Sequence, residues 1–150
     1  QLGVPQHLVS VQGTRSWARV LDYYVANPIA AGGGTNIVYE THVYDHNDEF
    51  DNRFEAPHGT IPVIIGEFGP ADLGGLVMTL DECDELMERA EAIDVPWLAW
   101  SFHQGCPPEL IEEHGTVAQQ CGSLPGGMSV TPTEWGTRVK NRLAKAYGSP

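Results

Sequence analysis

Apolar residues follow two different periods along the chain, and each change of period predicts a change of secondary structure. Short runs rich in β-branched and aromatic residues predict strands over 7–12, 36–44, 61–68 and 95–103. Apolar residues spaced three and four positions apart predict helices over 17–25, 80–92 and 133–147. We therefore expect four strand–helix units, an order that favours a parallel sheet with right-handed crossovers.

Local signals set the ends of these elements. Thr79 followed by Glu82 forms a capping box that predicts the start of the second helix. Ser16 is a candidate cap for the first helix, and Asn27-Pro28 ends it. The polar stretch 45–58 predicts a solvated loop or a short helix. The glycine-rich segment 30–35 lacks the Gly-Lys-Ser/Thr of a phosphate loop and predicts a connector.

The expected fold class is α/β, because four βα units make up half of a (β/α)8 barrel. The 150 residues are the size of one domain, so we expect a single half-barrel over 1–150 with a long loop at 105–132. A half-barrel alone leaves two edge strands and an inner apolar face in water. We therefore expect completion by self-association, as a homodimer, or by a complementary half-barrel chain.

Composition excludes several kinds of partner. Twenty acidic residues against eight basic ones give a net charge of −12, which disfavours nucleic acid. No apolar run approaches the roughly 20 residues of a membrane span. The acidic alternation at 45–51 lacks the glycine and the final glutamate of a calcium loop, and no cysteine pair has zinc spacing, so no metal or other cofactor is expected. Cys106 and Cys121 are candidates for a disulfide in an oxidising compartment.

Chemistry-bearing side chains gather at predicted strand ends. The third strand ends in Gly66-Glu67-Phe68-Gly69, which places one carboxylate where α/β proteins carry their active sites. Alternation along the second strand puts Glu40, His42 and Tyr44 on one face, and Trp100 lies in the fourth strand. Each has a purely structural alternative: a Glu paired at a strand end, a His in the core, a Trp that only packs.

These motifs, in this order, resemble the C-terminal half of glycoside hydrolase family five, the cellulase family of a retaining (β/α)8 clan. The matching stretches are 36–44, 63–69 and 98–102, and Trp17 fits the family's fifth βα unit. The resemblance implies a secreted endoglucanase that acts on β-1,4-linked glucan, with Glu67 as the nucleophile. It also implies that His42 and Tyr44 orient this nucleophile, and that the substrate-binding residues are His42, Tyr44, Trp100 and Trp17.

One departure from the family is clear. The family's acid/base is a Glu in an Asn-Glu-Pro motif, which this sequence does not contain. Glu40 is expected to lie too deep in its strand to replace it, and His103 would occupy the corresponding place in a two-fold dimer. Glu55, Asp72 and Glu109 are further carboxylates, but they lie in loops, so the sequence does not show whether any of them is near Glu67.

Two other functions stay open. A non-catalytic carbohydrate-binding half-barrel would keep the aromatic residues without the acid/base. A metal-dependent hydrolase would use His42, His46 and His58 with nearby acids. The chain has no initiator Met and no visible signal peptide, so we expect a processed or truncated product.

Overall fold

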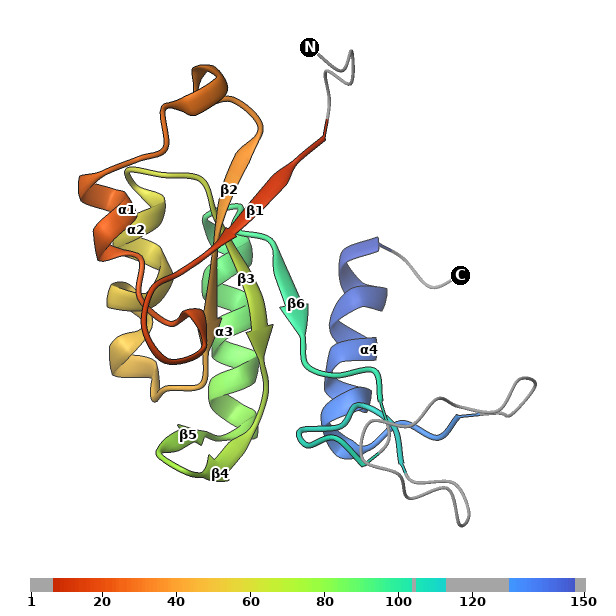
Figure 1. Ribbon diagram of the computed structural model, residues 1–150. Helices are drawn as coiled ribbons and strands as arrows, with labels where there is room; N and C mark the ends of the chain where they lie inside the picture. The colour runs from red at the N-terminus through yellow and green to blue at the C-terminus, as the bar shows by residue number, and fades with distance from the viewer. Residues whose placement is uncertain (1–6, 104, 113–129, 148–150) are drawn as a thin grey trace.

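A parallel four-stranded sheet organises the molecule. The computed structural model describes residues 7–103, 105–112 and 130–147. The strands are β1 (Val9–Gln12), β2 (Ile37–Val43), β3 (Val63–Phe68) and β6 (Trp97–Ala99), hydrogen-bonded in the order β1-β2-β3-β6 (Figure 1). All three pairings are parallel. The strands lie within the four predicted ranges, and the predicted α/β fold, part of a (β/α)8 barrel, is confirmed.

Helices cover one side of this sheet. Figure 1 shows α1 (Asp22–Ala26), α2 (Ala56–His58) and α3 (Leu80–Ala92) along that side, and α4 (Glu134–Tyr147) beyond β6. The polar stretch after β2 is largely helical, because a 3-10 turn η3 (Asn47–Glu49) and a π-helical turn η4 (Asp51–Glu55) precede α2. A further 3-10 turn, η2 (Ala31–Gly33), lies in the glycine-rich connector.

The first helix is shorter than predicted. The predicted range 17–25 contains a 3-10 turn η1 (Ser16–Ala18) and then α1, which begins only at Asp22. Thr14 forms an antiparallel bridge with Val20, which closes the intervening residues into a tight loop. Inside that loop, Trp17 and Ala18 have φ of 52° and 59°. These left-handed conformations cannot continue an α-helix, so the prediction of a helix from residue 17 was wrong.

A hairpin that the sequence analysis did not predict follows β3. It consists of β4 (Ala71–Leu73) and β5 (Leu76–Met78), joined by Gly74 and Gly75 with φ of 65° and 83°. Two consecutive positive φ values suit a two-residue hairpin turn, which glycine adopts without steric cost. The Val77 amide donates to the Tyr44 carbonyl at 3.0 Å, so the hairpin is attached to the end of β2.

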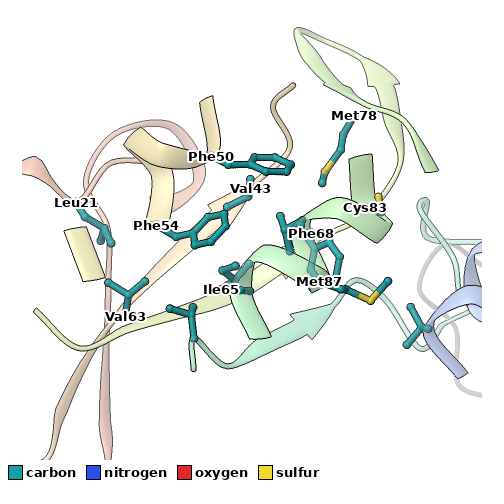
Figure 2. Packing of buried hydrophobic residues seen from close by; sticks show 14 of the residues in the cluster. Leu21, Val43, Phe50, Phe54, Val63, Ile65, Phe68, Met78, Cys83 and Met87 are labelled. Atoms are coloured by element: carbon teal, nitrogen blue, oxygen red, sulfur yellow. The ribbon is translucent and has the colours of Figure 1, made fainter. Parts of the chain in front are cut away.

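The hydrophobic core lies between the sheet and the helices. Figure 2 shows Val43 and Phe68 from the strands packed with Phe50 and Phe54 from the segment after β2. All four side chains are fully buried, and so is Cys83 on α3, a free cysteine that packs as an apolar residue. Helix α3 has the bounds that the sequence predicted, and both hydrogen bonds of the Thr79–Glu82 capping box are present.

The segment after β6 packs against the start of α4. The Leu110 amide donates to the Ser101 carbonyl at 3.0 Å, and the Thr133 amide donates to the Leu110 carbonyl at 3.1 Å. Gly136 allows this approach, because a Cβ at that position would overlap the Leu110 carbonyl. Cys106 is disulfide-bonded. Cys121 lies outside the described residues, so its pairing with Cys106 stays a prediction, as does most of the loop 105–132.

Candidate active site

A β-bulge in β3 sets the direction of Glu67. Thr41 pairs with Ile65, but the next residue of β2, His42, pairs with Glu67, so Gly66 is an extra residue in β3. The pairing with β6 shifts at the same place, between Ile65 and Phe68. Ile65 and Phe68 are both fully buried in the core. In a regular strand of the same sequence, alternation from Ile65 would turn Glu67 toward the core; the bulge places it on the face of His42 instead.

Two side chains contact the same oxygen of Glu67. His42 belongs to β2, and Tyr44 directly follows the end of β2. The Tyr44 hydroxyl donates to Glu67 Oε2 at 3.3 Å. His42 Nδ1 lies 3.3 Å from that oxygen, within ion-pair distance but off the direction of a hydrogen bond. Burial and the negative charge of Glu67 raise the pKa of Tyr44, so the phenol keeps its proton and acts as a donor.

Glu40 contacts the opposite edge of the His42 ring. His42 Nε2 lies 2.9 Å from Glu40 Oε1, and Ser10 Oγ donates to Glu40 Oε2 at 2.7 Å. Gln12 adds a longer bond of 3.4 Å. Partial burial raises the pKa of Glu40, but the hydrogen bonds from Ser10, His42 and Gln12 outweigh burial and hold this pKa below its ordinary value. Glu40 is therefore an ionised carboxylate at neutral pH, in contact with the His42 ring.

A cavity of about 510 Å³ opens in front of Glu67. Tyr44, Glu67, Trp17 and Trp100 line it, and the two tryptophans are 65% and 36% exposed. The structure thus brings four of the five predicted site residues to one cavity, and the fifth, His42, contacts Glu67 from beside it. The other lining residues belong to the hairpin region and to the segment after β6: Pro70, Ala71, Asp72, Leu76, Cys106, Pro107 and Pro108.

The sequence analysis missed the wall of the cavity formed by the hairpin. The adjacent glycines 74 and 75 were the signal that could have revealed this turn. Through the hairpin, Asp72 joins Glu67 as a second carboxylate lining the cavity. Glu55, in contrast, is paired with Arg89 at 2.6 Å, and Glu109 does not line this cavity.

A metal-dependent site finds no support in the described part of the chain. Within those residues, no group of three His, Cys, Asp or Glu side chains is placed to hold a metal ion. His46 Nδ1 instead lies 2.9 Å from Glu82 Oε1, at the start of α3. None of the described helices is long and apolar enough to cross a membrane.

Solved structures of similar shape are glycoside hydrolases. A β-glucanase of Saccharophagus degradans, solved with cellotetraose, aligns with a TM-score of 0.67 and 21% identity over 91% of this chain and 41% of its own. An endoglucanase catalytic domain of Thermobifida fusca aligns with a TM-score of 0.62 and 20% identity, over 91% and 45%. The fold of this chain matches part of the (β/α)8 barrels of these proteins.

Further similarities agree with that fold. A β-mannanase of Streptomyces thermolilacinus, solved with mannohexaose, aligns with a TM-score of 0.66 and 21% identity over 93% of this chain and 44% of its own. A protein of Cytophaga hutchinsonii reaches a TM-score of 0.69 and 25% identity, over 96% and 45%. The chain therefore spans less than half the length of these proteins. No protein-family model and no curated protein matches the sequence.

Proposed function

We propose that this chain is the nucleophile-bearing half of a retaining glycoside hydrolase that cleaves β-1,4-linked glucan. The observation that carries the proposal is the position of Glu67. A bulge turns its carboxylate out of the core, two side chains contact it, and it faces a cavity with two exposed indoles. A carboxylate held in this way is the group that retaining glycosidases use as nucleophile.

The proposed reaction begins with attack of the Glu67 carboxylate on the anomeric carbon. The bond from that carbon to the glycosidic oxygen breaks, and the leaving oxygen takes both electrons and a proton from an acid. Water then attacks the glycosyl ester, releases the sugar with retained configuration and restores Glu67. Tyr44 donates to the carboxylate and His42 orients it, while Trp17 and Trp100 offer flat surfaces for the apolar faces of sugar rings.

The reaction also needs a general acid that protonates the leaving oxygen, and we assign this role to no residue of this half-barrel. Retaining enzymes place it about 5–5.5 Å from the nucleophile. Asp72 shares the cavity with Glu67. The proposal assigns the acid to a second half-barrel, either a second copy of this chain or a complementary chain, and places the complete enzyme outside the cell, where β-glucan polymers are found.

Covalent trapping tests Glu67 without the acid. A 2,4-dinitrophenyl 2-deoxy-2-fluoro-β-cellobioside loses a stable phenolate that needs no protonation, so the nucleophile alone suffices for the first step. We expect intact-mass measurement to show one sugar added to the wild type, and peptide mapping to locate it on Glu67. Glu67→Gln should gain none, because an amide is a poor nucleophile.

Asp48→Asn is the matched control, since Asp48 is an exposed carboxylate on η3, away from the cavity. It should be labelled like the wild type. Labelling of Glu67→Gln, or labelling at another carboxylate, would contradict the role of Glu67.

A non-catalytic carbohydrate-binding module is the alternative, favoured by the two exposed tryptophans in a chain without Asn-Glu-Pro. Such a module would never be labelled, and its affinity for cello-oligosaccharides would be the same in the wild type and in Glu67→Gln. Calorimetric titration of both proteins with cellotetraose, run beside the trapping experiment, separates the two functions.

A further inference from the structure

His42 lies between two carboxylates that come from different strands. Its Nε2 is 2.9 Å from Glu40 Oε1 on β2, and its Nδ1 is 3.3 Å from Glu67 Oε2 on β3. The residue is 6% exposed. We propose that Glu40 is a positioning residue that acts through His42 on the nucleophile Glu67. This inference rests on the function proposed above for Glu67.

The chemistry of the three groups gives Glu40 this role. An ionised carboxylate only accepts hydrogen bonds, so both nitrogens of the His42 ring face acceptors. Because Glu40 accepts, Nε2 carries the proton of their contact, and Glu40 thereby fixes the plane of the ring and the position of Nδ1 beside Glu67.

Glu40 is itself fixed by neighbours on both sides. Ser10 and Gln12, from β1, donate to its two oxygens. On the other side, Gly66 of β3 leaves the space that the Glu40 side chain occupies, because a Cβ at Gly66 would overlap that side chain, including its Oε1. Gly66, which precedes the nucleophile, thus leaves room for the carboxylate of Glu40 on the neighbouring strand. The result is a continuous series of contacts from β1 through β2 to β3.

This arrangement also has a consequence for the reaction cycle. When Glu67 becomes a glycosyl ester, it loses its negative charge, and its contact with His42 Nδ1 changes. The contact between Glu40 and Nε2 remains, so the ring stays oriented during the lifetime of the intermediate. Glu40 does not line the cavity and cannot itself touch the sugar from there.

The rate of covalent trapping measures the effect of Glu40 on Glu67. In Glu40→Gln the side chain keeps its shape and loses its charge, and we expect trapping to slow about tenfold or more, the size of effect seen for partners one contact removed from a reacting centre. The dissociation constant for cellotetraose should stay as in the wild type, because Glu40 makes no contact with the cavity. Asp48→Asn serves again as the control with unchanged rate.

Gly66→Ala should also remove the contact between Glu40 and His42. The new methyl group displaces the end of the Glu40 side chain, which is flexible, so the protein should fold and trap as slowly as Glu40→Gln. Combining the two substitutions should add little further slowing, since each removes the same contact. Trapping by Glu40→Gln at the wild-type rate, in a protein of unchanged melting temperature, would overturn the proposal.

Ring ¹⁵N signals of His42 give a readout that needs no reaction. We expect them to shift in Glu40→Gln and in Gly66→Ala, because Nε2 loses its charged acceptor, and to stay in place in Asp48→Asn. If the wild type is not trapped at all, the proposed function fails, and these shifts alone decide whether Glu40 orients His42. Identical ring signals in the wild type and Glu40→Gln would refute the role of Glu40.

Discussion

Single residues in this chain combine structural and chemical tasks. Tyr44 donates its hydroxyl to Glu67, and its backbone carbonyl receives the amide of Val77 from the hairpin. Tyr44, which contacts Glu67, therefore also attaches one wall of the cavity to β2. Because burial and the charge of Glu67 raise its pKa, Tyr44 does not ionise in the range of ordinary enzyme assays. It remains a donor throughout that range.

Glu82 shows how one carboxylate responds to pH. It accepts from the Thr79 amide, the Thr79 hydroxyl, the Asn47 amide and His46. Burial alone would raise its pKa, but these bonds outweigh burial and lower the pKa to about 2. A lowered folded-state pKa contributes stability that is present above the unfolded-state pKa of about 4.3 and is lost as pH falls toward 2.

Glu82→Gln tests this contribution. The variant should unfold at a lower denaturant concentration than the wild type at pH 7, and the two curves of stability against pH should converge as pH falls from about 5 to about 2. Urea unfolding followed by circular dichroism at a series of pH values measures both. Asp48→Asn should keep the wild-type dependence of the free energy of unfolding on pH. If Glu82→Gln kept it as well, the stabilising role of the Glu82 carboxylate would be contradicted.

At the level of elements, glycines decide where two segments can approach. The start of α4 lies against the segment after β6, and Gly136 is buried there, with the Leu110 carbonyl in the place that a Cβ would occupy. Trp135, the neighbouring residue, donates from its indole to the Trp100 carbonyl at 2.9 Å. The contact between α4 and this segment therefore helps to hold the end of β6, and with it Trp100, in place.

Gly136→Ala should break that contact. The added methyl group meets a backbone carbonyl, which cannot move aside as a side-chain end can, so we expect a loss of about 3 kcal/mol or more. For a domain of this size, the melting temperature should fall by roughly 10 °C. Differential scanning calorimetry measures it. Thr137 is an exposed neighbour on the same helix, so Thr137→Ala should leave the melting temperature nearly unchanged. An unchanged melting temperature in Gly136→Ala would show that α4 and the segment after β6 can move apart at no cost.

Several elements could be predicted from the sequence because their signals are local. The capping box at Thr79 and Glu82 and the apolar spacing that follows determined both ends of α3. The first helix could not be predicted, since its start depends on the bridge between Thr14 and Val20, a tertiary contact. The local spacing of apolar residues does not indicate such a contact.

The site was predicted in part for the same reason. Glu67, Tyr44 and Trp100 lie at ends of strands, where sequence patterns of α/β proteins point, and they line one cavity together with Trp17 from η1. The bulge at Gly66 depends on how β3 pairs with both neighbours, so alternation within β3 alone does not reveal it. The role of Glu40 likewise became visible only when β1, β2 and β3 were side by side.

At the scale of the whole molecule, an open sheet is combined with a high negative charge. The edge strands β1 and β6 expose Val9 and Leu98, at 52% and 57%. Such edges favour pairing with another sheet, whereas a net charge of −12 keeps copies of the chain apart. The inner face is less apolar than expected, because Ser10, Gln12, Glu40 and His42 form a polar network there.

Salt should shift the balance between these two tendencies. We expect the sedimentation coefficient to rise from that of a monomer toward that of a dimer as sodium chloride increases, because salt screens the repulsion but leaves the edges unchanged. Leu98→Gln should weaken the association. Tyr23→Gln should not, because Tyr23 is an exposed residue of α1, on the helix-covered side of the sheet. A monomer at every salt concentration would contradict self-association and favour a complementary chain.

The bulge at Gly66 also bears on how the gene can change. Because Gly66 is the extra residue of the bulge, an in-frame deletion of codon 66 would leave Ile65, Glu67 and Phe68 in regular register with Thr41, His42 and Val43. Such a deletion would keep Glu67 on the face of His42 and Phe68 on the core side, whereas Glu40 would lose the space that Gly66 leaves for its side chain.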